Sequence, residues 1–245
     1  MNRAVIVVAA LLVVGAGAFA VNMNSGAPSG TALSLIEFEG MNDPAELARI
    51  AQPMVQGNPN AAIKVIEFGD YGCPACGQFF AQVKPQFDLA YGSNDDVAFV
   101  FYDFPAGSSN HSFVVARAAR CAGDQGAFWE YHAEIFQNQG EWRLAANTPM
   151  DALDSYAEAA GIDVGEFGSC LRSDRHAEVV SANMALGQNL GVTGTPTVLV
   201  SDGSGSPVRL GNDFAGIRAT VDAALGAGAE SGAESGDTSG NESGS

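Results

Sequence analysis

Two cysteines, Cys73 and Cys76, stand where an apolar strand runs into a helix, and this junction constrains the fold of the chain most strongly. Residues 62–68 are mostly apolar and rich in β-branched side chains, which predicts a buried strand. After the motif, apolar residues recur at steps of three and four, as on one face of a helix: Cys76, Phe79, Phe80, Val83 and Phe87. Cys73 therefore lies at a helix start, where free N–H groups and the helix dipole stabilise a thiolate. In such motifs the thiol pKa falls from about 8.5 to roughly 3.5–7.5.

The CxxC spacing also occurs as half of many zinc sites, which need a second pair of ligands at a finger-like spacing. The two other cysteines, Cys121 and Cys170, are isolated in the sequence. The three histidines are also far apart: His111, His132 and His176. Neither set supplies the second pair, so we assign no residue to a metal and expect redox chemistry at Cys73 and Cys76.

A second motif, Thr195-Pro196, directly precedes an apolar segment at 197–200 that predicts a strand. Proline cannot donate a hydrogen bond to a neighbouring strand. It therefore either opens this strand as an ordinary trans residue or marks a special turn. The motif lies far downstream of the CxxC, so only the fold can bring the two together.

In combination, the two motifs resemble the thioredoxin superfamily, in which a cis-proline loop packs against the CxxC. Three segments, in their order along the chain, resemble its DsbA-like branch of exported thiol–disulfide oxidoreductases: residues 67–76, 118–129 and 194–197. The resemblance covers roughly residues 55–225. It implies an α/β fold, namely a thioredoxin fold with an inserted helical subdomain. Helical periodicity takes over between about residues 110 and 190, which is where we place the insert.

The resemblance also implies roles for individual residues. Thr195 and Pro196 match the loop that offers its backbone to the substrate chain. The dipeptide between the cysteines departs from the family's strongest oxidants, because Ala75 stands where they have a histidine that stabilises the thiolate. We therefore expect a potential less oxidising than the family's extreme.

Glu67 ends the apolar strand before the motif and allows two interpretations. It is either a solvated carboxylate at a strand end, or a buried acid beneath the thiols whose raised pKa suits it to proton transfer with Cys76. The DsbA-like family has an acid at the matching position, which favours the second interpretation. Asp70 and Tyr71 are closer to the thiols in sequence, and we expect them in a loop at the rim of the site.

The ends of the chain differ in composition from its centre. Residues 1–21 hold one basic residue and a long apolar run, which predicts a cleaved secretory signal or a retained membrane anchor. Either places the catalytic domain outside the cytoplasm. Residues 22–54 predict a linker, with a short helix at 41–52 capped by Asp43. Residues 226–245 are Gly, Ser and acidic residues, and we expect them to be disordered.

The net charge of −17 comes from 28 acidic and 11 basic residues, and the basic residues do not cluster. This pattern gives no surface for nucleic acid. In an exported protein, Cys121 and Cys170 are natural partners in a structural disulfide once the CxxC takes the other two cysteines. The alternative is a pair of buried free thiols.

These observations predict a thiol–disulfide oxidoreductase that introduces or exchanges disulfides in exported proteins and needs no dissociable cofactor. Cys73 would be the nucleophile and Cys76 the resolving thiol. Its partners would be substrate thiols or disulfides and a redox protein, in the membrane or soluble, that recycles the CxxC. The alternatives are a reductase or isomerase on the same scaffold, and a non-catalytic binding module tethered to the membrane. Both cysteines, the acid and the proline loop argue against the module.

Overall fold

A five-stranded mixed sheet forms the centre of the molecule, and the computed structural model describes residues 34–234 of the chain. The strands lie in the order β1-β3-β2-β4-β5. Their bounds are β1 Met54–Gln56, β2 Ile63–Gly69, β3 Val97–Asp103, β4 Thr197–Ser201 and β5 Val208–Leu210. Only β2 and β3 pair in parallel, and the other neighbours are antiparallel. This mixed sheet confirms the predicted α/β thioredoxin fold.

The central strand β2 carries the chain to the CxxC. It pairs with β3 on one side and β4 on the other, so that Glu67 lies opposite both Phe101 and Val198. Helices cover both faces of the sheet, which explains why β2 and β3 are apolar almost throughout. Because β4 runs antiparallel to β2, the start of β4 lies beside the end of β2. The topology thus brings Thr197 next to Phe68, on the approach to the cysteines.

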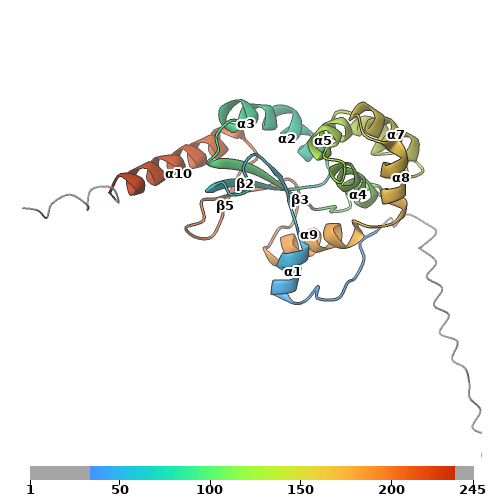
Figure 1. The fold of residues 1–245 in the computed structure, drawn as a ribbon, viewed down its shortest axis with the longest axis horizontal. Helices are drawn as coiled ribbons and strands as arrows, with labels where there is room; N and C mark the ends of the chain where they lie inside the picture. Colours follow the sequence, from blue (N-terminus) through green and yellow to red (C-terminus); the bar gives the residue numbers. More distant parts are fainter. Residues whose placement is uncertain (1–33, 235–245) are drawn as a thin grey trace, which may run out of the picture.

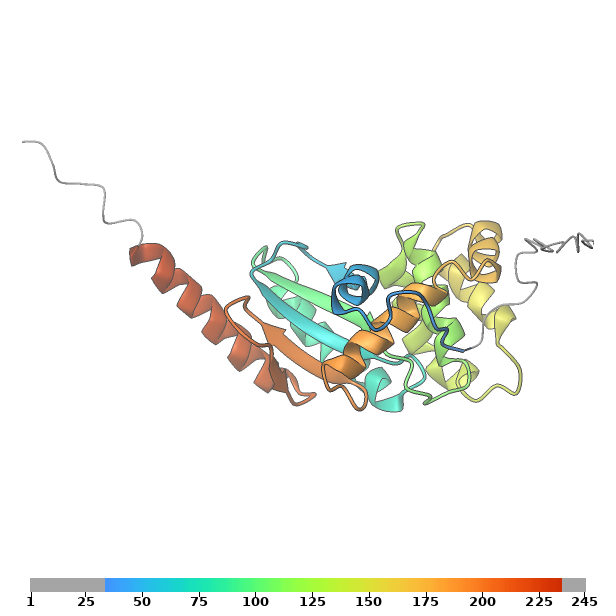
Figure 2. The same ribbon diagram turned by 90° about the horizontal axis from the view of Figure 1, so that it is seen from below.

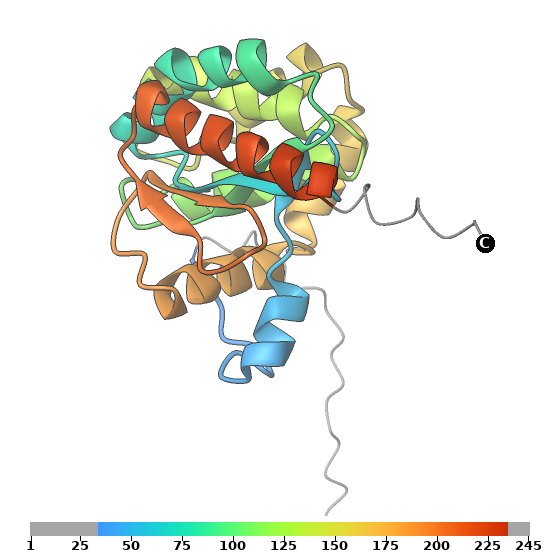
Figure 3. The ribbon, with the colours of Figure 1, turned by 90° about the vertical axis from the view of Figure 1, so that its left-hand side faces the viewer.

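The two helical layers lie above and below the sheet in Figure 1, and the end-on view of Figure 3 shows the same order. One layer holds α2, α3 and α10, and the other holds α1 and α9. Their bounds are α1 Pro44–Ile50, α2 Pro74–Gln82, α3 Lys84–Tyr91, α9 Ala177–Asn189 and α10 Phe214–Glu234.

The helix after the CxxC was predicted as one continuous element but is broken at Val83, between α2 and α3. The cause is Pro85, which has no N–H to donate and whose ring would clash with the carbonyl one turn earlier. Phe80 is also only partly buried, although it belongs to the predicted apolar face.

Five further helices form the inserted subdomain beyond one end of the sheet (Figures 1 and 2). They are α4 Ser112–Gly123, α5 Phe128–Gln137, α6 Gln139–Trp142, α7 Met150–Ala159 and α8 Val164–Arg172. The insert shares one continuous hydrophobic core with the sheet, so the two parts are packed together. Helix α9, at the end of the range expected for the insert, packs on α1 and β3 and also contacts insert helix α4.

The ends of the described region differ from the sequence analysis in two respects. The capped helix α1 forms as expected, with Asp43 accepting hydrogen bonds from Ala45 and Glu46 N–H, but the short strand β1 was not predicted. The expectation of disorder from residue 226 is wrong for residues 226–234, which continue α10. Alanine and glutamate recur there and favour a helix despite the glycines.

None of the helices within residues 34–234 is long and apolar enough to cross a membrane. The predicted signal or anchor at 1–21, residues 22–33 of the predicted linker and the last part of the tail lie outside the described residues.

Candidate active site

The two thiols lie at the start of α2, in different environments. Cys73 is the N-cap residue, with an extended backbone, and Pro74 begins the helix. Cys73 is 8% exposed, whereas Cys76 in the first turn is fully buried. Both are free cysteines in this structure. A reagent from solution therefore meets Cys73 first.

The Cys73 thiol is strongly acidic. The hydrogen bond from the Cys76 thiol contributes most to lowering the pKa of Cys73 to about 5, although burial opposes it. The Thr195 side chain and the backbone N–H groups of Cys76 and Ala75 add to the effect, and the two amides belong to the first turn of α2. Cys73 is therefore a thiolate at neutral pH.

Cys76 has the opposite character. Its hydrogen bond to Cys73, its burial and the charge of Glu67 raise the pKa of Cys76 far above the usual range. The Asp70 N–H, 3.5 Å from Cys76 Sγ, opposes the rise. The pair thus holds one proton on Cys76 and a negative charge on Cys73.

Glu67 is buried beneath the thiols, with 3% of its surface exposed. Burial raises its pKa to about 8, against the lowering effect of the Lys84 charge. Its Oε1 atom has no hydrogen-bond partner among the described residues. Lys84 is buried as well: its Nζ donates to Gln56 and Asp88, each at 2.6 Å, and lies over the Phe99 ring. The sequence is compatible with a solvated or a buried Glu67, and in the structure this carboxyl is buried.

The proline loop lies directly against Cys73. The Thr195–Pro196 peptide bond is cis, and the Thr195 carbonyl oxygen lies 3.3 Å from Cys73 Sγ. The loop is fixed from behind, because Thr197 Oγ1 donates to the Gly194 carbonyl at 2.8 Å and accepts from Arg209 at 2.7 Å. The fold therefore joins two motifs that are far apart in the sequence.

Asp70 and Tyr71 were expected at the rim of the site, and this expectation is wrong because both are 1% exposed. Asp70 accepts hydrogen bonds from Gly72 N–H at 2.8 Å and Ser108 N–H at 3.3 Å, which fixes the loop before the cysteines. Tyr71 points inward, and its hydroxyl lies 2.9 Å from Nδ1 of His132 on α5.

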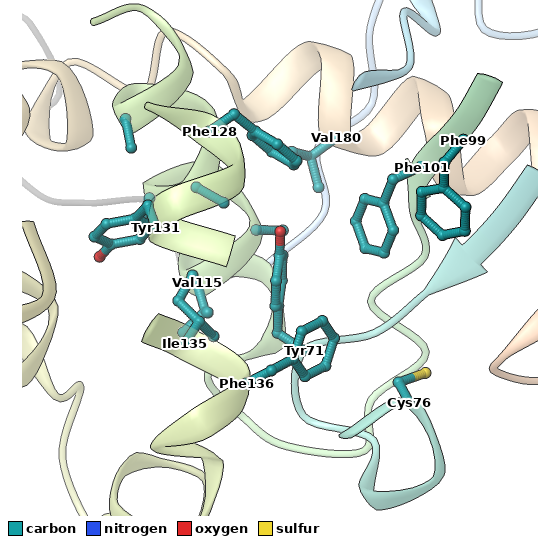
Figure 4. Packing of buried hydrophobic residues seen from close by; sticks show 14 of the residues in the cluster. Tyr71, Cys76, Phe99, Phe101, Val115, Phe128, Tyr131, Ile135, Phe136 and Val180 are labelled. Carbon is teal, nitrogen blue, oxygen red and sulfur yellow. The ribbon is translucent and has the colours of Figure 1, made fainter. Parts of the chain in front are cut away.

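Figure 4 shows the Tyr71 ring between Phe101 and Phe136, with Cys76 at the edge of the same apolar cluster. The loop that leads into α2 is thus anchored in the insert as well as in the sheet.

Two residues near the thiols were missed by the sequence analysis as parts of the site. Lys84 carried a signal, since it is one of two lysines and lies between two residues of the predicted apolar face, Val83 and Phe87. Gln139 at the start of α6 carried none. Its side-chain amide donates to the backbone carbonyls of Tyr71 and Cys73.

The other two cysteines are joined in the structure, as the sequence analysis expected. The Cys121–Cys170 disulfide links α4 to α8 inside the insert, with the Cα atoms 5.8 Å apart. Among the described residues, His176 forms a possible metal-binding group with these cysteines, because the ligand atoms all lie within 4.8 Å of one another. The two sulfurs are bonded to each other, so they are not available as thiolate ligands in this state.

Comparisons with known proteins agree with this geometry. The thioredoxin family profile described as "Thioredoxin" matches residues 50–222. The probable disulfide bond formation protein D of Bacillus anthracis is 31% identical over 177 residues, which cover 69% of this chain and 76% of that protein. The crystal structure of oxidised BdbD from Bacillus subtilis is 25% identical, with a TM-score of 0.61, and covers 71% of this chain and 96% of BdbD.

A further relative, the Na(+)/H(+) antiporter NhaA 1 of Salinispora arenicola, is 36% identical over 149 residues. The match covers 60% of this chain but 21% of the antiporter, so its transport activity is not carried over. The family, the sheet and the paired thiols lead to one assignment: this chain belongs to the DsbA-like protein thiol–disulfide oxidoreductases of the thioredoxin superfamily.

Proposed function

We propose that the enzyme works outside the cytoplasm and passes a Cys73–Cys76 disulfide to the thiols of exported proteins. The observation that carries the proposal is the asymmetry of the two thiols, with an acidic Cys73 beside the proline loop and a buried, proton-holding Cys76. The Cys121–Cys170 disulfide supports a compartment in which disulfides persist. The signal or anchor predicted at residues 1–21 supports the same location.

Exchange begins when a substrate thiolate attacks Cys73 Sγ in the oxidised enzyme. A new sulfur–sulfur bond forms to Cys73, the bond to Cys76 breaks, and the electron pair leaves on the Cys76 sulfur. We place the substrate segment against the Thr195–Pro196 loop, which lies beside Cys73 and can pair with an extended chain. Cys73 is the point of attack because it is the more exposed of the two sulfurs.

The departing Cys76 thiolate needs a proton, since its buried position strongly favours the neutral thiol. Glu67 is suited to supply it, because a pKa of about 8 keeps this carboxyl largely protonated at neutral pH. A second substrate thiolate then attacks the substrate sulfur of the mixed disulfide, and Cys73 leaves as the stable thiolate. The substrate gains a disulfide, and the enzyme takes up the two electrons.

The acidity of Cys73 favours this direction of electron flow. A stabilised thiolate stabilises the reduced enzyme, which makes the oxidised enzyme the stronger oxidant. A redox protein must then remove the two electrons and restore the disulfide, and we propose a membrane or soluble partner for that step.

The direction is tested by equilibrating the purified enzyme with glutathione and quantifying reduced Cys73 by alkylation. We expect the enzyme to oxidise glutathione across most of the buffer range. A potential below that of glutathione would instead favour a reductase, and a pair that exchanges with neither form would contradict the enzyme mechanism altogether.

The roles of the two thiols are tested by trapping. Cys76→Ser should accumulate mixed disulfides with a disulfide-bonded peptide, because reduced Cys73 attacks the peptide disulfide and no Cys76 thiol is present to resolve the product, whereas Cys73→Ser should accumulate none. Mixed disulfides on Cys73→Ser would reverse the assignment. Location is tested with a membrane-impermeant maleimide, which should label reduced Cys73 in intact cells before lysis.

A further inference from the structure

Gln139 joins the helical insert to the backbone around the nucleophilic cysteine. It lies at the first residue of α6, and its Nε2 atom lies 2.6 Å from the Tyr71 carbonyl oxygen and 2.9 Å from that of Cys73. One side-chain amide has two N–H groups, so both bonds form at once. Gln139 therefore spans the segment that leads from β2 into α2.

Gly77 leaves the space that Gln139 occupies. A Cβ atom on Gly77 would lie 2.9 Å from Gln139 Oε1 and 3.3 Å from both Cδ and Nε2. Gly77 is in the first turn of α2, and its N–H donates to the Cys73 carbonyl at 3.1 Å. The Cys73 carbonyl thus accepts from the helix and from Gln139, and a side chain at residue 77 would displace the glutamine.

We infer that Gln139 is a positioning residue for Cys73, which holds the first turn of α2 so that its amides point at the sulfur. The inference rests on the proposed role of Cys73 as the nucleophile. By holding the carbonyls of Tyr71 and Cys73, Gln139 fixes the planes of the peptides next to the sulfur. The positive end of its amide also faces the thiolate's own backbone, which favours the charged form.

This arrangement matters because the backbone N–H groups add to the stabilisation that the Cys76 thiol and the Thr195 side chain give to the Cys73 thiolate. Ala75 has no side-chain donor, so backbone N–H groups contribute to the Cys73 thiolate where a polar side chain cannot. Backbone donors are effective only at defined angles, and small rotations of the peptide weaken them. Gln139 acts through these groups, because its amide donates to backbone carbonyls and not to a thiol.

The test compares four variants with the wild-type enzyme. Gln139→Ala removes both bonds, and Gln139→Glu keeps the size of the side chain but places acceptors against two carbonyls. Gly77→Ala displaces the amide while leaving Gln139 in the sequence. The matched control is Gln86→Ala, which removes an exposed glutamine of α3 that bonds to the carbonyl of Gln82 at the end of α2 and makes no hydrogen bond to the segment from Tyr71 to Cys73.

Three quantities are measured for each variant: the thiolate absorbance of the reduced protein against pH, the equilibrium constant with glutathione, and the stability of the oxidised protein in urea. Gln139→Ala should raise the pKa of Cys73 and make the enzyme less oxidising, by about threefold to tenfold in the glutathione equilibrium. Gln139→Glu should have a larger effect, because its charge opposes the thiolate. Gln86→Ala should match the wild type.

Gly77→Ala separates positioning from stability. Alanine favours a helix more than glycine does, so stability should hold or rise while the equilibrium moves in the same direction as in Gln139→Ala. If Gln139→Ala lowers stability but neither it nor Gly77→Ala moves the Cys73 pKa or the equilibrium, the positioning role is wrong. If instead the wild-type enzyme has no acidic thiol at residue 73, the proposed function fails independently of Gln139.

Discussion

Replacing Glu67 with glutamine should change how the stability of the oxidised enzyme depends on pH. The carboxyl is 3% exposed, and its pKa rises from 4.5 to about 8, mainly because burial disfavours the charged form. A group with a raised pKa stabilises the fold fully below its unfolded value and loses that contribution as pH rises through the folded one. For Glu67 the free energy of unfolding should therefore decrease as the pH rises from 4.5 to about 8. Glutamine has the same shape and does not titrate.

The size of the effect follows from the shift. Each pKa unit corresponds to about 1.4 kcal/mol, so complete ionisation of Glu67 in the folded protein costs about 5 kcal/mol. Between about pH 5 and pH 8 the linked change in the free energy of unfolding is about 3 kcal/mol. The disulfide form is used because it removes the titration of the two thiols. The charge of Cys73 contributes less to the raised pKa of Glu67 than burial does, and the burial is the same in the disulfide form.

The assay is urea denaturation of the oxidised protein, followed by tryptophan fluorescence at several pH values. The wild type should lose about 3 kcal/mol relative to Glu67→Gln as pH rises through this window. His132 also titrates differently in the two states, since burial lowers its pKa to about 3, but it does so equally in both proteins and cancels in the difference. Glu130→Gln, at an exposed glutamate on α5, is the matched control and should follow the wild type.

Parallel curves for wild type and Glu67→Gln would refute the reasoning, because they would mean that Glu67 ionises equally in the folded and unfolded protein. The same variant carries a kinetic consequence. Without a carboxyl proton at residue 67, release of Cys76 during exchange should slow, and the rate should lose its dependence on a group with a pKa of about 8.

Three further results are expected. The reduced enzyme should attack disulfides more slowly as pH drops below about 5, where the Cys73 thiolate takes up its proton. Single-turnover alkylation of Cys73 would report the same loss of thiolate, and an unchanged rate at lower pH would contradict the acidic thiol. Replacing both Cys121 and Cys170 with alanine should lower the free energy of unfolding by about 4 kcal/mol in the chain-entropy model, because the disulfide joins residues 49 positions apart, yet leave most exchange activity. Unlinked Cys121 and Cys170 peptides after non-reducing digestion would show that the bond is absent. Asp103→Asn should lower the free energy of unfolding, measured in urea, by about 3–5 kcal/mol, because it leaves the buried Arg120 charge without its partner. A loss under about 1 kcal/mol would show that water reaches the ion pair.

Apolar patterns in the sequence were enough to predict those parts of the site that are formed by residues close together in the chain. The strand before Cys73 and the helix after it follow from apolar periodicity, and their order alone puts Cys73 at a helix N-terminus. The strand after Pro196 follows from the same kind of signal. Where the prediction of the α2 region was wrong, a local rule was overlooked: Pro85 breaks the helix whatever the apolar stripe favours.

The remaining features depend on contacts between distant segments, which a single sequence does not encode in a readable way. Asp70 and Tyr71 have the composition of a rim loop, yet they are buried because insert helix α5 and the 108–112 segment pack over them. Gln139 is one polar residue among many in the insert. Its role depends on the fold, because the residue lies 66 positions from Cys73 in the sequence and only the folded chain brings it to the Cys73 carbonyl. Strand β1 is too short for its periodicity to be recognised.

The asymmetry of the two thiols also follows from this mixture of local and distant contacts. The helix start alone would stabilise either cysteine, since both lie within the reach of the same free N–H groups. Their mutual hydrogen bond separates them first, because it lowers the pKa of Cys73 and raises that of Cys76. Burial adds to the difference, since the sheet and insert enclose Cys76 fully, whereas Cys73 keeps an exposed edge beside Thr195. With Ala75 between them, no side chain in the dipeptide adds charge to either thiol. The acidity of Cys73 therefore comes first from the Cys76 thiol and then from the Thr195 side chain and the α2 backbone. Substitutions that move the α2 backbone, which carries Cys76, should shift the redox equilibrium more than substitutions that alter the surface charge around it.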